Sequence, residues 1–285
     1  MRKPDFFIVG AAKAGTTSLF QYLTQHPSIF IPTIKEPHYF SEYYDSGAPV
    51  FHSIDDYLRL FDDCPDGALA GDASTSYLYS VDAARGIRKL QPEARIVAVL
   101  RNPVDRAYSL YWFNRRDLVE DLGFEEALEA EPERMRDNRH FRFHYVTSGK
   151  YAAQIQKYFD AFGRDAVRVY LFEDLKADAP ALCRDIFRFL GVRADLPLET
   201  GGRFNPSGEP RSRLLSHLLT RQFPRVRRML PKTAKMVKHR LTQVNVRTPP
   251  PMHPATRAML VESFRPDVES LQALLGRDLS GWVVA

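Results

Sequence analysis

The chain has 285 residues, of which 44% are hydrophobic and 26% are charged, and its formal net charge is +5. This composition is typical of a globular protein and excludes a disordered chain or a coiled coil, and a chain of this length buries a core without a disulfide or a metal. Its two cysteines, Cys64 and Cys183, lie far apart and outside any zinc-ligand spacing, and no apolar run reaches the roughly 18 residues that span a bilayer. We therefore expect a reducing, cytoplasmic location.

The positive charge is concentrated in one stretch near the C-terminus. Between Pro210 and Leu260 there are twelve Lys and Arg residues and no Asp or Glu, so the rest of the chain carries a net charge of −7. We expect the residues at about 205–250, here called the basic segment, to form a lid-like cover or a dock for an anionic surface.

Short apolar runs predict buried strands, and the segments of helical periodicity between them predict helices. The predicted strands are 6–9, 69–73, 95–100 and 167–172, and the predicted helices are 16–25, 104–118, 124–136, 151–162, 180–190 and 253–275. Pro266 predicts a kink or a split in the last helix. Strands that alternate with helices predict an α/β fold with a central parallel sheet flanked by helices, in a single domain over residues 1–285.

A glycine-containing loop joins the first predicted strand to the first predicted helix. Gly10 and Gly15 enclose Lys13, and hydroxyl side chains follow at Thr16, Thr17 and Ser18 in the first helical turn. Such a loop aims backbone N–H groups and a helix N-terminus at one point, which predicts a P-loop type of site for a phosphate-like anion. Thr16 stands where the nucleoside-triphosphatase motif has its lysine, and no convincing magnesium-binding carboxylate follows a strand, so a donor without metal is favoured.

A second candidate anion site follows the third predicted strand. Arg101 stands at the carboxyl end of that strand, where open α/β sheets bind ligands, and Ser109 lies about two turns into the next helix. A guanidinium group and a hydroxyl can bind a second phosphate together.

These two motifs, GAAKAGTTSL at residues 10–19 and LRNPVDRAYSLYW at residues 100–112, together resemble the nucleotide-binding motifs of sulfotransferases that use 3′-phosphoadenosine 5′-phosphosulfate (PAPS). The KEPHYF at residues 35–40 is similar to a segment of the heparan sulfate and bacterial branches of that family. The resemblance continues through GKY at 149–151 to LLGRDLSGW at 274–282, and so covers nearly the whole chain.

The resemblance implies a role for each motif residue. Lys13, Ala14, Gly15, Thr16, Thr17 and Ser18 would hold the 5′-phosphosulfate, and Arg101 and Ser109 the 3′-phosphate, without a metal. The implied reaction is an in-line transfer of the sulfuryl group from PAPS to an acceptor hydroxyl or amine, with Glu36 as general base and Lys13 stabilising the leaving oxygen. His38 is the rival base, because Glu36 and His38 would share a face if residues 35–40 are extended.

The acceptor side is less specified. The resemblance implies that residues 71–77 line the acceptor, which makes Asp72 and Tyr77 candidate acceptor residues together with Lys35 and Tyr151, although a strand-capping Asp and a core Tyr are equally compatible. Ala73 stands where the heparan sulfate branch has a lysine, and the cysteine pair of those lumenal enzymes is missing. We therefore expect a small natural product, a lipid or a glycan precursor as acceptor, with the basic segment as a lid or an acceptor-side segment.

Three other hypotheses remain open on these residues. A metal-dependent P-loop kinase of small molecules would need magnesium and a lysine at position 16. A nucleic-acid-binding protein could use residues 210–260, although Phe223 is the single aromatic residue there. A peripheral membrane contact by residues 213–230, where apolar and basic residues are interleaved, is compatible with sulfuryl transfer to a lipid.

Overall fold

A computed structural model describes residues 1–34, 36–43, 51, 53–137, 140–200, 208–212, 214–216, 241 and 244–284. The chain divides into two compact units. Unit 1 contains Met1–Asn102, Lys150–Gly202 and Pro266–Gly281, and unit 2 contains Pro103–Gly149, Arg203–Arg265 and Trp282–Ala285. Of the candidate site residues, Lys13, Glu36 and Arg101 belong to unit 1 and Ser109 belongs to unit 2.

Unit 1 is built on a parallel five-stranded sheet with the strand order β2-β3-β1-β4-β5. The strands are β1 (Phe6–Gly10), β2 (Ile29–Phe30), β3 (Leu69–Ala73), β4 (Arg95–Leu100) and β5 (Val167–Leu171). All five residues of β1 are buried, as its continuous apolar sequence predicts for a central parallel strand. The predicted parallel sheet is therefore confirmed, whereas the two residues of β2 are too few to show a periodicity in the sequence.

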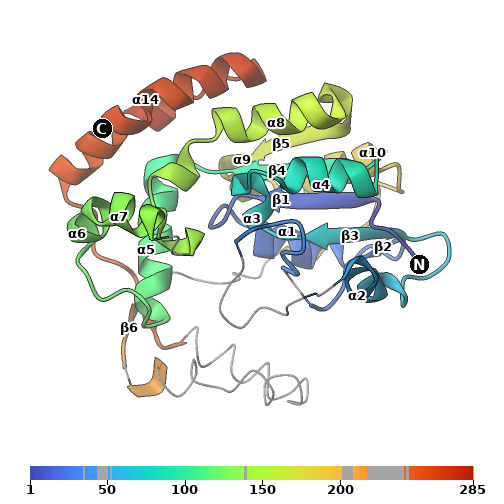
Figure 1. Ribbon diagram of the computed structural model, residues 1–285, viewed down its shortest axis with the longest axis horizontal. Helices are drawn as coiled ribbons and strands as arrows, with labels where there is room; N and C mark the ends of the chain where they lie inside the picture. The colour runs from blue at the N-terminus through green and yellow to red at the C-terminus, as the bar shows by residue number, and fades with distance from the viewer. Residues whose placement is uncertain are drawn as a thin grey trace. The chain divides into compact units, whose positions relative to one another are not determined.

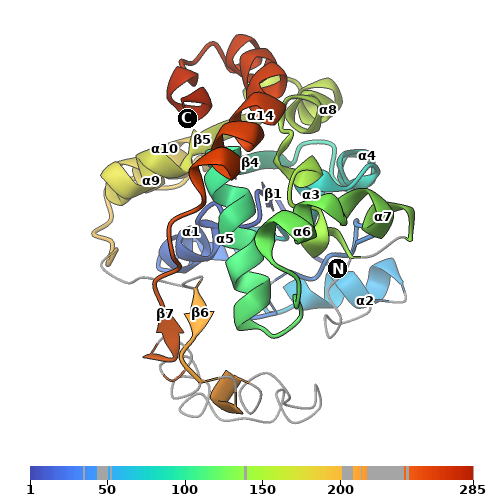
Figure 2. The ribbon, with the colours of Figure 1, turned by 90° about the vertical axis from the view of Figure 1, so that its left-hand side faces the viewer.

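Helices cover both faces of this sheet. They are α1 (Thr16–Leu23), α2 (Ile54–Leu58), α3 (Ser76–Tyr79), α4 (Ala83–Leu90), α8 (Ala152–Phe162), α9 (Phe172–Ala177) and α10 (Ala179–Leu190). Figures 1 and 2 show α1, α9 and α10 on one face and α3, α4 and α8 on the other. The helices that follow β1 and β3 thus lie on opposite faces, and ligands of open α/β sheets bind at the carboxyl ends of strands with this arrangement.

Unit 2 contains α5 (Pro103–Arg116), α6 (Phe124–Glu129), α7 (Glu131–Arg136) and the first part of α14 (Pro254–Leu275). The single helix predicted over 124–136 is wrong, because α6 ends before Pro132, whose missing N–H and bulky ring break the hydrogen-bond ladder. Of the kink or split predicted at Pro266, the split does not occur, since α14 continues through this residue with Phe264 and Val268 buried on either side. Among the described residues, no helix has the length and hydropathy to cross a membrane.

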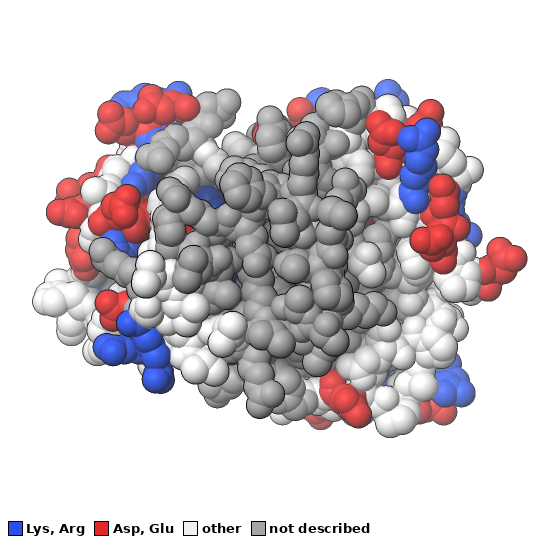
Figure 3. Space-filling model, turned by 90° about the horizontal axis from the view of Figure 1, so that it is seen from below, with Lys and Arg blue, Asp and Glu red and all other residues white. Residues whose placement is uncertain are grey.

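The two ends of the basic segment lie beside each other in unit 2. There, β6 (Glu209–Pro210) pairs antiparallel with β7 (Val246–Arg247), and the N–H of Arg211 donates to the carbonyl of Asn245 at 2.7 Å. Of this segment, residues 205–207, 213, 217–240 and 242–243 lie outside the described residues. On the face in Figure 3, the described basic and acidic side chains are intermixed. The covering role of the basic segment and the single-domain organisation therefore stay predictions.

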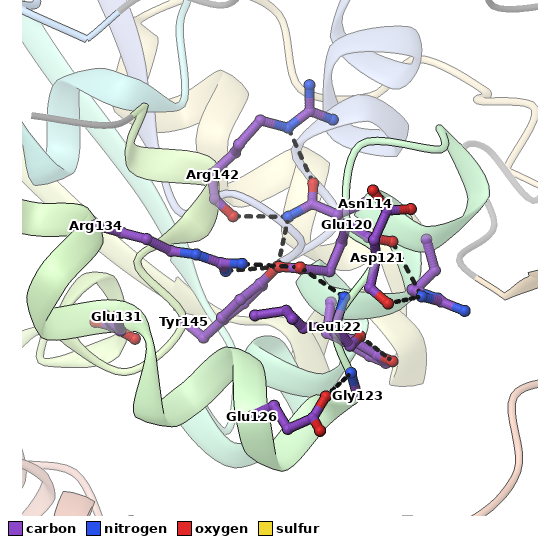
Figure 4. A network of polar contacts seen from close by, with 12 residues as sticks. Asn114, Glu120, Asp121, Leu122, Gly123, Glu126, Glu131, Arg134, Arg142 and Tyr145 are labelled. Carbon is purple, nitrogen blue, oxygen red and sulfur yellow. Dashed lines mark hydrogen bonds and ion pairs between the residues drawn. The ribbon is translucent and has the colours of Figure 1, made fainter. Parts of the chain in front are cut away.

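A buried polar network joins three parts of unit 2 (Figure 4). Arg134 of α7 donates two hydrogen bonds, at 2.7 and 2.9 Å, to the carboxylate of Glu120, whose side chain is 1% exposed. The hydroxyl of Tyr145 donates to the same carboxylate at 2.7 Å, and Asn114 of α5 donates to that hydroxyl at 2.9 Å. Every member of this network is hydrogen-bonded, so the buried charges are compensated.

Candidate active site

The loop between β1 and α1 forms the first part of the candidate site. It places the predicted residues Lys13 to Ser18 at one strand–helix junction, with Thr16 buried and Lys13, Thr17 and Ser18 half-buried. The N–H groups of the first turn of α1 have no acceptor within the helix, and the helix dipole favours an anion at this end. This local structure is what an anion-binding loop requires.

Gly15 permits the sharp turn from the loop into α1. Its φ is 87°, in the left-handed region, and a Cβ atom there would lie 2.7 Å from Cδ2 of Leu175 and 2.9 Å from Cδ2 of Phe172. Both neighbours belong to α9, so the loop approaches that helix as closely as a residue without a side chain allows. A glycine is needed here for two independent reasons, the backbone conformation and the space.

We expect Gly15→Ala to lower the free energy of unfolding by roughly 2–4 kcal/mol, the sum of left-handed strain and overpacking. Urea denaturation measures this change. Gly191→Ala is the matched control, because Gly191 is also left-handed (φ 78°, ψ 22°) but its added Cβ would meet only a flexible Arg95 nitrogen at 3.4 Å. Equal losses in the two variants would show that the close approach of α9 contributes nothing.

Arg101 lies at the carboxyl end of β4, the neighbour of β1. Its Nη1 donates to the carbonyl of Lys13 at 3.2 Å, and its guanidinium carbon lies 4.9 Å from the centre of the Phe172 ring. Its own carbonyl accepts a hydrogen bond of 3.1 Å from the hydroxyl of Tyr151. The predicted anion residue Arg101 is thus held against the loop, whereas Ser109 lies in α5 of unit 2, so their shared phosphate contact stays a prediction.

Replacing Arg101 tests that contact. We expect Arg101→Ala to raise the Kd for 3′-phosphoadenosine 5′-phosphate (PAP), measured by calorimetry, by about 10–100-fold, because a charge-assisted hydrogen bond to phosphate is lost. Arg95→Ala, at the other end of the same strand, should leave that Kd unchanged. An unchanged Kd in Arg101→Ala would exclude Arg101 from the phosphate site.

Glu36 and His38 follow α1 and β2 in the chain and lie against the end of β3. The N–H of Glu36 donates to the carbonyl of Ala73 at 3.2 Å, and the N–H of His38 donates to Oγ of Ser74 at 3.2 Å. The extended conformation that would place both side chains on one face is not adopted, since the φ angles of Glu36 and His38 are 60° and 56°. Their side chains nevertheless meet, with His38 Nε2 3.5 Å from Glu36 Oε2.

The two candidate bases differ in exposure. The Glu36 side chain is 27% exposed, and its Oε2 accepts a hydrogen bond of 3.2 Å from Oγ1 of Thr75. The His38 side chain is 4% exposed, with Nδ1 2.6 Å from Oγ of Ser76. Glu36 is therefore the more accessible to an acceptor, while His38 is enclosed beside it.

Backbone strain is concentrated in this region. Among the described residues, four other than glycine have a positive φ, and three of them are Lys13, Glu36 and His38; the fourth is Leu118. Such conformations cost about 1–3 kcal/mol each, persist only where surrounding contacts impose them, and are common at active sites. Sequence reasoning found these three residues by motif and missed their conformation, because no local pattern reports it.

The predicted acceptor residues that the structure describes are buried. Asp72 is 1% exposed, Tyr77 and Tyr151 are fully buried, and the hydroxyls of Tyr77 and Tyr57 donate to Asp72 Oδ2 at 2.9 and 2.7 Å. The role of Tyr57 was missed by the sequence analysis. Lys35 lies outside the described residues, so the acceptor contacts stay predictions.

Within the described ranges, no group of three or more His, Cys, Asp or Glu residues could hold a metal ion.

Comparisons with known proteins bear on this site. The crystal structure of a sulfotransferase from Alicyclobacillus acidocaldarius is similar to the chain, with 36% identity, a TM-score of 0.79 and coverage of 99% of both chains. The bifunctional heparan sulfate N-deacetylase/N-sulfotransferase 3 of Homo sapiens is 28% identical to the chain over 199 residues. The bifunctional heparan sulfate N-deacetylase/N-sulfotransferase 1 of Mus musculus is 27% identical to it over 218 residues. These alignments cover 67% and 72% of this chain but 22% and 24% of those relatives, so the chain spans about a quarter of their length.

The family assignment rests on most of the chain. Residues 3–217 match the family described as "Sulfotransferase domain". This match and the bacterial structure confirm the predicted fold class and enzyme class, with PAPS as the donor that this family uses, and they disfavour the kinase and nucleic-acid hypotheses. The chain belongs to the sulfotransferase domain family.

Proposed function

We propose that the chain transfers the sulfuryl group of PAPS to a hydroxyl or amine of its acceptor by in-line displacement, with Glu36 as general base. The observation that carries this proposal is the placement of the anion loop and Glu36 at neighbouring strand ends. The loop follows β1, Glu36 is hydrogen-bonded to Ala73 at the end of β3, and β1 and β3 pair directly. A base and an anion-binding loop at adjacent strand ends are what the two sides of such a displacement require.

The residues present fit the charges of the donor. The loop provides the Lys13 ammonium, the Thr17 and Ser18 hydroxyls and the N-terminus of α1 for one anionic group, and Arg101 provides a guanidinium for a second. In the transfer, the acceptor oxygen or nitrogen forms a bond to sulfur and loses its proton to Glu36. The bond from sulfur to the phosphate oxygen breaks, and PAP leaves with that electron pair, stabilised by Lys13.

For the acceptor, we propose a small natural product, a lipid or a glycan precursor. Ala73, 3% exposed, stands at the end of β3, where a lysine would help to bind a polyanionic sugar. The printed names of the curated relatives refer to heparan sulfate, but the chain spans only about a quarter of those proteins. A neutral or weakly charged acceptor therefore suits this strand end better than a glycosaminoglycan.

Calorimetry with PAP and with ATP, in the presence of a chelator, tests the donor. We expect PAP to bind at least about tenfold more tightly than ATP, because Arg101 supplies a partner for the 3′-phosphate that ATP lacks. Preference for ATP, or a requirement for magnesium, would reject the proposal and restore the kinase hypothesis. Release of PAP from PAPS in a panel of hydroxyl and amine acceptors then identifies the acceptor class.

A further inference from the structure

Asp72 is a buried carboxylate that the proposed reaction does not use. Its side chain lies at the end of β3 and is 1% exposed. Its Oδ2 accepts hydrogen bonds from the hydroxyls of Tyr57 and Tyr77 at 2.7 and 2.9 Å, and its Oδ1 accepts one from Oγ of Ser74 at 2.8 Å. All three donors are hydroxyl groups of neutral side chains. None of these three donors therefore neutralises the charge of the carboxylate.

Ser74 connects this carboxylate to the candidate base. A hydroxyl has one hydrogen and two lone pairs, so when Ser74 donates to Asp72 its lone pairs are left for other donors. The N–H of His38 donates to this oxygen at 3.2 Å. Asp72 therefore sets the orientation in which Ser74 holds the backbone of His38.

The rest of the turn after β3 holds the same short segment. The carbonyl of Ala73 accepts from the N–H of Glu36, and Oγ1 of Thr75 donates to the Glu36 carboxylate, both at 3.2 Å. Oγ of Ser76 lies 2.6 Å from Nδ1 of His38. The left-handed backbone at Glu36 and His38 is thus imposed by contacts with residues 73–76, which directly follow Asp72 in the chain.

The charge of Asp72 opposes folding at neutral pH. Burial raises the pKa of Asp72 to about 6, against the lowering effect of its three hydroxyl donors and with a smaller upward contribution from Glu36. Because this value exceeds the ordinary 3.8, the folded state binds the proton more tightly, so stability falls as the pH rises from about 4 to 6. A buried carboxylate that destabilises the fold is typical of a functional position.

We propose that Asp72 is a positioning residue that orients the Ser74 hydroxyl and through it keeps Glu36 and His38 in the conformation required for proton abstraction. This inference rests on the proposed role of Glu36. Asp72→Asn tests it most closely, because an asparagine can still accept from both tyrosines but presents an N–H₂ donor to Ser74. The Ser74 hydrogen then loses its carboxylate acceptor while the size of the side chain at position 72 is kept.

The first measurement needs no acceptor. The ring nitrogen signals of His38, assigned with His38→Gln, are compared by NMR in the wild type, Asp72→Asn and Ser74→Ala. We expect both variants to shift these signals in the same direction. In the wild type the Ser74 amide signal should also titrate with a midpoint near 6, and this transition should disappear in Asp72→Asn and persist in His38→Gln.

Glu120→Gln is the matched control. Glu120 is also a buried carboxylate that accepts a tyrosine hydroxyl at 2.7 Å, but it belongs to unit 2. The Glu120→Gln variant should have lower thermal stability but unchanged His38 signals. Unchanged His38 signals in Asp72→Asn, or an equal shift in Glu120→Gln, would overturn the inference.

The second measurement is a double-mutant cycle on PAP release from PAPS. We expect Asp72→Asn to lower kcat by about 10–100-fold with the Kd for PAP within about twofold, and to have no further effect in the Glu36→Gln background. A full additional loss in that background would contradict action through Glu36. Failure of the proposed function is recognised separately, by a fully active Glu36→Gln enzyme or by a protein that does not bind PAP.

Discussion

Glu36→Gln should lower kcat by about 10²–10⁴-fold, the usual contribution of a positioned general base, while the Kd for PAP stays within about twofold. The amide has nearly the shape of the carboxylate and can still accept the hydrogen bond from Thr75, so the turn after β3 is retained. What is lost is the ability to take the acceptor proton. The measurements are PAP release under saturating PAPS and calorimetry with PAP.

Two further variants distinguish the loss of a general base from a general effect on the site. Glu42→Gln changes another carboxylate of the same stretch, which accepts a hydrogen bond of 2.9 Å from the N–H of Val81, and it should keep kcat within about threefold. Lys13→Ala should reduce both kcat and affinity for PAP, because we propose that its ammonium contacts the donor in the ground state as well as during transfer. Product formation at nearly the wild-type rate by Glu36→Gln would remove Glu36 as the base and make His38 the next candidate.

Arg134→Met should lower the free energy of unfolding by about 3–5 kcal/mol, the cost of leaving one partner of a buried ion pair uncompensated. Glu120 would keep its tyrosine donor but lose both hydrogen bonds from the guanidinium. The matched control is Arg85→Met in the exposed pair with Asp82, whose side chains are 83% and 63% exposed, and it should change stability by less than about 1 kcal/mol. Urea denaturation of both variants at pH 7 measures the difference.

The pH dependence of this loss provides a second check. Burial raises the pKa of Glu120, but hydrogen bonds from Arg134 and Tyr145 outweigh it and leave that pKa below its ordinary 4.5. The pair therefore contributes fully above pH 4.5, and its contribution is lost as the pH falls through the lowered pKa. The Arg134→Met deficit should accordingly be smaller in acid than at pH 7. A loss of unfolding free energy that does not change with pH would show that it comes from the lost packing of the arginine alkyl chain.

Much of the architecture could be predicted because it depends on local sequence. The apolar run of β1, the glycines of the loop and the hydroxyls of α1 occur within 14 consecutive residues, Phe6 to Leu19. Each of these features can be recognised from its neighbours in the sequence. Helix breaks at prolines were harder to predict, since the break near Pro132 was not predicted and the split predicted at Pro266 does not occur. Pro132 ends one helix and begins another, whereas α14 continues through Pro266, because apolar packing on both sides of it compensates for one lost hydrogen bond.

The sequence alone was enough to predict the parallel α/β sheet, the glycine-containing loop around Lys13, the place of Arg101 at the end of β4, and the sulfotransferase family that these motifs indicate. The way in which Glu36, His38 and Asp72 are held became visible only in the folded chain. Their conformations depend on hydrogen bonds to residues 73–76, which lie 36 to 39 positions away in the chain. Such contacts follow no helical or strand period, so they leave no pattern in the sequence, and they form only when β3 brings its carboxyl end beside the segment that follows β2.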